Sequence, residues 1–163
     1  MTIDVAIPEH LTRLSIRREF AAPPSLLWKM WTDPAHVGVW WGPEHFSTPV
    51  VEMDVRPGGA IRMVMRAPDG SEFGFDGRFV SLNEPHELVT RTWVNYEDGE
   101  IWFEVEQTIR FEAVGDHTVM HFNARVIEAR ADALGPLSGM EAGWTGSFDK
   151  LDAQVRVVTA SAG

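Results

Sequence analysis

Alternating apolar and polar residues near the start of the chain predict a strand over about residues 11–20. Leu14 and Ile16 share one face of this segment, and charged or polar residues occupy the other face. This two-residue period is typical of a half-buried strand. Pro23 and Pro24 end it, because proline cannot extend a strand's hydrogen-bond ladder but suits the first turn of a helix.

Two short helices are predicted after this strand. The first covers residues 26–31, which are apolar except for Lys29. The second begins at Asp33 and Pro34, because Asp can cap free backbone N–H groups and proline is favoured at the first helical position. Gly42 and Pro43 end the second helix, since glycine can adopt a left-handed cap and proline cannot continue the helix.

The middle of the chain alternates again, and turn sequences divide it into short segments. Short turns between alternating segments predict an antiparallel meander of six strands. The turns are Pro57-Gly58-Gly59, Pro68-Asp69-Gly70, Asn83-Glu84-Pro85, Glu97-Asp98-Gly99 and Gly115-Asp116.

The last segment is helical. Apolar residues recur every three or four positions from Leu137 to Val158 and form one stripe, as on the buried face of a helix. Strands grouped apart from helices indicate an α+β fold. We expect one domain over residues 11–158, after a flexible lead-in over 1–10 and before a tail over 159–163. A flat sheet would pack tightly on the last helix, whereas a curved sheet would leave a cavity.

Composition narrows the range of partners and locations. The chain has 163 residues, a net charge of −10 and no cysteine. The acidic balance disfavours nucleic acid and anionic membranes, which select basic surfaces. Without cysteine there is no disulfide, thiolate zinc site or cysteine nucleophile. No secretory signal or membrane-spanning run is visible, so we expect a cytoplasmic protein with no membrane insertion.

A set of apolar side chains is predicted to face the gap between sheet and helix. Methionine adapts to irregular spaces and is common in permissive apolar sites, so this set favours a ligand pocket, with an ordinary core as the alternative. By strand parity or helix phase the set comprises Met53, Met63, Met65, Phe73, Phe75, Phe103, Phe122, Met140, Trp144 and Phe148.

Three further residues are candidates for the pocket. Trp40 and Trp41 point about 100° apart on a helix, so one is expected at the pocket mouth and the other in the core; alternatively, both anchor the helix. Gln107 shares parity with its apolar neighbours. Its amide is either a satisfied core group or a group that orients a ligand, because glutamine is neither an acid nor a base near neutral pH.

Catalytic and metal motifs are not evident. No two of the six histidines form the helical H-E-x-x-H motif of a zinc site, and the glycines after Pro57 do not form a phosphate loop. Glu44 and His45 could offer an acid/base pair at the pocket rim, or they are exposed loop residues. We therefore predict no catalytic residue, no metal and no cofactor.

Several short motifs stand out along the chain. They are Trp31-Thr32-Asp33-Pro34, Trp40-Trp41-Gly42-Pro43, Asp54-Val55-Arg56-Pro57-Gly58-Gly59, Gly77, Glu84-Pro85 and Gly143-Trp144. In this order and spacing they resemble the activator of Hsp90 ATPase homologue 1-like (AHSA1-like) domains of the START/Bet v 1-like superfamily. The resemblance covers about residues 11–158.

This resemblance implies a helix-grip fold: a curved antiparallel sheet of about seven strands around a long C-terminal helix, with two short helices between strands 1 and 2. It also implies a deep apolar pocket. Three functions stay open. The chain could bind a small apolar, aromatic or lipid-like molecule, act as an Hsp90-associated ATPase-activator-like protein, or be a cyclase- or hydrolase-like enzyme. It is expected to be a monomer or a homodimer.

Overall fold

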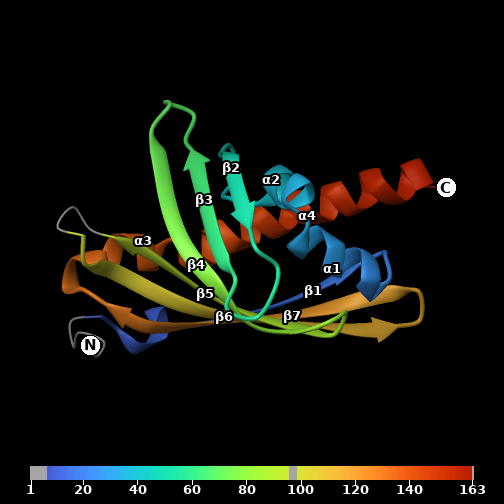
Figure 1. Ribbon diagram of the computed structural model, residues 1–163, viewed down its shortest axis with the longest axis horizontal. Helices are drawn as coiled ribbons and strands as arrows, with labels where there is room; N and C mark the ends of the chain where they lie inside the picture. Colours follow the sequence, from blue (N-terminus) through green and yellow to red (C-terminus); the bar gives the residue numbers. More distant parts are fainter. Residues whose placement is uncertain (1–6, 96–98, 163) are drawn as a thin grey trace.

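A computed structural model of the chain describes residues 7–95 and 99–162, and it has a seven-stranded antiparallel sheet beside a long helix (Figure 1). The strands are β1 (Arg13–Phe20), β2 (Ser47–Met53), β3 (Ala60–Arg66), β4 (Glu72–Asn83), β5 (Glu87–Asn95), β6 (Ile101–Val114) and β7 (His117–Ala129). The α-helices are α1 (Pro24–Thr32), α2 (Pro34–Trp40), α3 (Leu134–Ser138) and α4 (Met140–Ala162), with 3-10 turns at Glu9–Leu11 and Ala131–Ala133.

The sheet order is β1-β7-β6-β5-β4-β3-β2, so β2 to β7 form a meander and β1 pairs with the last strand. The sheet curves around α4, with β2, β3 and β4 rising beside the helix and the other strands passing beneath it (Figure 1). The predictions of an α+β fold, seven strands and two short helices after β1 are confirmed. The curved sheet, rather than the flat one, is the arrangement found.

Glycine at one position allows two strands of the sheet to come close together. A Cβ atom on Gly77 of β4 would lie 2.4 Å from the carbonyl oxygen of Arg91 and 2.9 Å from a methyl carbon of Thr92, both on β5. Real Cβ atoms essentially never approach backbone so closely. The glycine therefore permits β4 and β5 to pair closely at this point of the curved sheet.

The first two helices begin where the sequence predicts, but α2 ends at Trp40, and Trp41, predicted to be its last residue, has an extended backbone. The Asp33 carboxylate accepts a hydrogen bond from the backbone N–H of Ala35 at 3.0 Å, which is the expected cap of α2. The Trp40 side chain is fully buried, and its indole N–H donates to the carbonyl of Met30 at 2.8 Å. This bond ties the end of α2 to α1.

The C-terminal helix differs from the prediction in two ways. The expected apolar stripe is divided between two helices. Leu137 lies on the short α3, the helix is interrupted at Gly139, and α4 begins at Met140. Helix α4 also continues past Val158 to Ala162. The break lies at Gly139, and glycine is a poor interior helix residue.

Residues 1–6 of the expected lead-in, and residues 97 and 98 of the expected turn at 97–99, lie outside the described residues. Within the rest of the lead-in, Ile7 is buried in the core and a 3-10 turn covers Glu9–Leu11.

Candidate functional site

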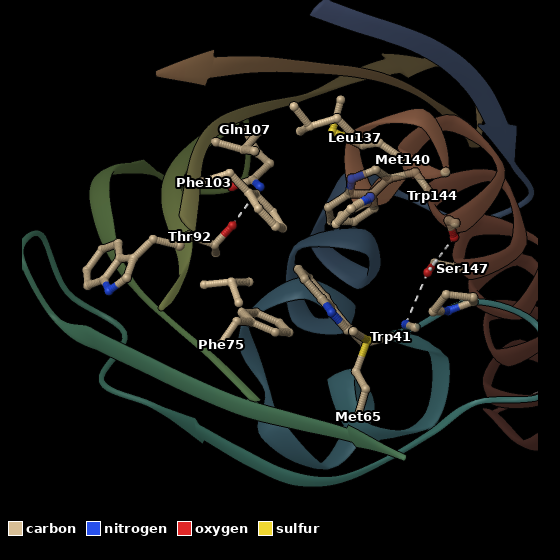
Figure 2. Close-up of a pocket in the computed structure, with 18 residues that line it drawn as sticks. Trp41, Met65, Phe75, Thr92, Phe103, Gln107, Leu137, Met140, Trp144 and Ser147 are labelled. Carbon is tan, nitrogen blue, oxygen red and sulfur yellow. Dashed lines mark hydrogen bonds between the residues drawn. The ribbon is translucent and has the colours of Figure 1, made fainter. Parts of the chain in front are cut away.

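A pocket of about 260 Å³, partly open to solvent, lies between the concave face of the sheet and helices α3 and α4 (Figure 2). This volume is just below the roughly 300–1,000 Å³ of typical small-molecule sites, so it suits a ligand of one or two rings. Its lining comprises Trp41, Gly42, Pro43, Met65, Phe75, Thr92, Trp93, Val94, Phe103, Val105, Gln107, Pro136, Leu137, Gly139, Met140, Gly143, Trp144 and Ser147.

Aromatic rings form much of the pocket wall. Trp41, just after α2, meets Trp144 of α4 edge to face, with ring centres 4.9 Å apart and planes at 75°. On its other side Trp41 stacks on Phe75 of β4 at 5.8 Å and 27°. Figure 2 shows Trp41 between these two rings. Rings arranged in this way offer both faces and edges to a planar apolar molecule.

A lysine on α4 holds the loop that carries Trp41. The Lys150 ammonium lies 3.4, 3.3 and 3.1 Å from the backbone carbonyl oxygens of Trp41, Pro43 and Phe46. Burial lowers the pKa of Lys150 below its ordinary value. The three carbonyls partly replace the water that this cation loses. We call residues 41–46 the rim loop.

The rim loop is also anchored through its backbone. Gly42 has φ 103°, a left-handed conformation that favours glycine, and its N–H donates to the hydroxyl of Ser147 at 3.1 Å. That hydroxyl in turn donates to the carbonyl of Gly143 at 3.0 Å. A Cβ atom on Gly146 would lie 3.1 Å from the backbone nitrogen of Glu44. Small residues on α4 therefore let the rim loop pack directly on the helix.

One buried amide supplies the polar side of the pocket. The Gln107 side chain is 2% exposed. Its Oε1 accepts from the Thr90 hydroxyl at 2.8 Å, and its Nε2 donates to the Thr92 hydroxyl at 2.9 Å. Both threonines lie on β5, where Thr90 is the direct cross-strand partner of Gln107. The oxygen and the nitrogen of the amide thus each have one partner within the sheet, and the residue also lines the pocket.

Among the described residues, the pocket lining contains no Asp, Glu, His, Lys or Arg side chain. Glu44 and His45 lie on the rim loop, but their side chains are 78% and 77% exposed and 3.8 Å apart. Within residues 7–95 and 99–162, no three His, Asp or Glu residues gather as metal ligands. A bound molecule would therefore meet neutral groups.

Seven of the thirteen residues predicted for the pocket line it: Trp41, Met65, Phe75, Phe103, Gln107, Met140 and Trp144. Four others, at most 1% exposed, lie deeper in the core: Trp40, Met63, Phe122 and Phe148. They share the predicted inward direction, but other rings stand between them and the pocket. Trp144, for example, lies 4.6 Å from Phe122 and 5.5 Å from Phe148, measured between ring centres.

Two predicted residues lie elsewhere. Met53 is half-buried and lines a small separate void. Phe73 is 51% exposed and does not face the pocket, contrary to the prediction. Its parity is correct, since it pairs with Met65 on β3. However, the end of the β3–β4 hairpin extends past α4 (Figure 1), and among the described aromatic rings Phe73 meets that of Phe46, with ring centres 6.1 Å apart.

Several lining residues were not predicted from sequence. Thr92 could have been found from strand register, because Thr90 pairs with Gln107 and Thr92 lies two residues further on the same face. Ser147 and Gly143 carry no apolar signal, and only the path of the rim loop against α4 brings them to the pocket. Pro136 and Gly139 line it because α3 breaks away from α4.

A family model described as "Activator of Hsp90 ATPase homolog 1-like protein" matches residues 21–156. Comparison with curated proteins finds no match. None of the described helices combines the length and the apolar character needed to span a membrane.

Solved structures of bacterial proteins share the fold. Protein CV1439 from Chromobacterium violaceum is 25% identical, with a TM-score of 0.79 over 88% of this chain and 96% of that chain. The AHSA1 (SPO3351) protein from Silicibacter pomeroyi is 24% identical, with a TM-score of 0.74 over 89% and 98% of the two chains. A protein from Arthrobacter aurescens is 23% identical, with a TM-score of 0.79 over 90% and 87%.

Proposed function

The chain belongs to the family of activator of Hsp90 ATPase homolog 1-like proteins, and from this membership and the pocket geometry we propose that it binds a small, uncharged, apolar or aromatic molecule. Folds of this kind commonly bind hydrophobic ligands. The observation that carries the proposal is the pocket lining, whose described residues combine aromatic rings and methionines with no ionisable side chain.

The absence of charge in the lining decides which ligands fit. A carboxylate or ammonium group would lose its hydration in the pocket without gaining an opposite charge, and this is costly. A neutral ring would exchange water for contacts with Trp41, Phe75 and Trp144. Within the described lining, acid/base catalysis would also lack a side chain to carry the proton.

Binding can be tested with indane, a neutral two-ring hydrocarbon, followed by isothermal titration calorimetry. Met140→Trp fills the pocket from α4, and Val157→Trp adds the same bulk to an exposed position of that helix. We expect indane to bind the wild type and the Val157→Trp variant, and to bind Met140→Trp at least tenfold more weakly. Absence of binding at ~1 mM, or equal binding by all three proteins, would contradict the proposal.

The family description supports a second candidate function. It names Hsp90 ATPase activation, so the chain could act on its host's Hsp90. Adding the purified chain to that Hsp90 and measuring ATP hydrolysis tests this candidate directly. A raised hydrolysis rate with a detectable complex would support it, and an unchanged rate with no complex would discard it.

A further inference from the structure

Close to the pocket lies one buried hydrogen-bond donor without a partner among the described residues. Trp31 on α1 is 3% exposed, and its indole Nε1 has no hydrogen-bond partner among the described residues. A buried N–H group left unpaired is unfavourable, because it has given up its bond to water. Some acceptor outside the described side chains is therefore expected near Trp31.

A small space lies against this residue. An internal void of about 10 Å³, the inner void, is close to the minimum that holds one water molecule. It shares the lining residues Trp41 and Thr92 with the main pocket. Trp31 and Thr90 also line it, and its other lining residues are apolar.

The two threonines at the inner void have unused hydrogen-bonding capacity. Thr90 donates its only hydroxyl hydrogen to Gln107, so its oxygen can still accept. Thr92 accepts from Gln107, so its own hydrogen is still available. With the Trp31 N–H, the void is bordered by residues that offer two donors and one acceptor. One water can use all three, which is the usual number for a buried water.

We infer that Gln107 is the specificity-determining contact of the pocket, and that one water in the inner void closes the hydrogen-bond ring holding its amide. In this ring the water donates to Thr90, Thr90 to Gln107, Gln107 to Thr92, and Thr92 to the water. Trp31 donates to the same water. Each bond polarises the next, so a closed ring holds its members firmly. Thr90, Thr92 and Trp31 are therefore positioning residues for Gln107.

The ring also defines the ligand class, and this step rests on the proposed function. Of its two hydrogens and two lone pairs, the Gln107 amide spends one of each on the threonines. It keeps one N–H and one lone pair, on the nitrogen and the oxygen that share the amide carbon. A neutral group with the matching pair is another amide, so the pocket selects molecules that carry a lactam or a primary carboxamide on an apolar ring.

Three bicyclic compounds of similar shape can distinguish apolar binding alone from recognition of a lactam by Gln107. Indane has no polar group, 2-indolinone carries a lactam, and N-methyl-2-indolinone keeps the carbonyl but loses the N–H. We expect the wild type to bind 2-indolinone about tenfold more tightly than either of the others. Gln107→Met should remove this preference and keep indane binding. If indane and 2-indolinone both fail to bind, the proposed function fails; if both bind equally to the wild type, only the inference fails.

Two further measurements test the ring. Thr92→Val should reduce the preference for 2-indolinone over indane, whereas Thr108→Val, on the opposite face of β6, should leave it unchanged. A high-resolution crystal structure should show one ordered water in the inner void. A dry void, with the Trp31 N–H pointing at a neighbouring aromatic ring, would overturn the proposed hydrogen-bond ring. Should Gln107→Met fail to fold, the comparison of 2-indolinone with its N-methyl form on the wild type decides the matter.

Discussion

Trp41 and Trp144 meet edge to face with ring centres 4.9 Å apart, and this contact joins the rim loop to the long helix α4 at the pocket wall. Both rings belong to short motifs, Trp-Trp-Gly-Pro and Gly-Trp, that lie a hundred residues apart in the sequence. The fold brings them together because α4 runs along the concave face of the curved sheet (Figure 1). The pocket therefore depends on how the rim loop is held against the helix.

Replacing Trp41 tests its contribution to binding. Trp41→Leu removes the edge-to-face contact with Trp144 and the stacking on Phe75, and we expect indane to bind about tenfold more weakly. Trp102→Leu is the matched control, since the Trp102 indole N–H donates to Asp132 at 2.9 Å and the residue does not line the pocket. An equal loss in both variants, measured by calorimetry, would argue against a direct role for Trp41.

Removing the Lys150 ammonium should loosen the rim loop. Lys150→Met loses three contacts to backbone carbonyls, and we expect a loss of about 1–2 kcal/mol in the free energy of unfolding together with faster ligand release. Lys29→Met, at an exposed position on α1, controls for the lost charge. Urea unfolding and stopped-flow release measure the two effects, and an unchanged release rate would show that the loop is held by other contacts.

An ion pair on the outer face of the sheet predicts a pH dependence of stability. Burial raises the pKa of Glu106, but hydrogen bonds from Arg91 and Arg125 and their positive charges outweigh this effect, so the pKa lies below its ordinary value of 4.5. A carboxyl whose folded pKa is lowered stabilises the protein above its unfolded pKa. This stabilisation disappears as the pH falls through the folded pKa.

Glu106→Gln should therefore lower the free energy of unfolding by about 1 kcal/mol at pH 7. The gap between variant and wild type should shrink as the pH falls below the ordinary pKa of 4.5. Urea unfolding at a series of pH values measures it, with Glu52→Gln, at an exposed strand position, as the control for one lost negative charge. A gap that stays constant down to low pH would show that the stabilisation does not come from the ionised carboxylate.

Gly77 should not tolerate a side chain. In Gly77→Ala the new Cβ would lie 2.4 Å from the carbonyl oxygen of Arg91, so β4 and β5 must move apart, at a cost of about 2–4 kcal/mol. Gly74→Ala, on the same strand, would meet nothing closer than 3.8 Å and should change stability little. Thermal unfolding distinguishes the two, and equal midpoints would mean that the strands separate without penalty.

Local signals in the sequence predict most of the fold. Alternation predicts the strands, and Asp33 with Pro34 predicts the start of α2, because these features depend on neighbours in the chain. The break at Gly139 was missed because the apolar spacing continues across it from Leu137 to Met140. Periodicity reports which face is buried, and it does not report whether the backbone is continuous.

The pocket is harder to predict, because strand parity shows which face a side chain occupies and not how deeply that side chain is buried. Phe73 and Phe75 lie on the same face of β4, yet one is largely exposed and the other lines the pocket. Phe148 lies one helical turn after Trp144 but is buried behind it. These outcomes depend on the position at which α4 stops contacting the sheet. That position depends in turn on the curvature of all seven strands.

The central claim, that the pocket binds a small neutral ring, is tested most directly by titrating indane into ¹⁵N-labelled protein and recording amide chemical shifts. We predict saturable shifts that cluster at the pocket, at Gly42, Thr92, Gln107, Gly143 and Ser147. The amide shifts of residues whose side chains point to the outer face of the sheet, such as Arg125 and Asn123, should stay unchanged. No saturable shifts, or shifts centred on that outer face, would contradict the claim.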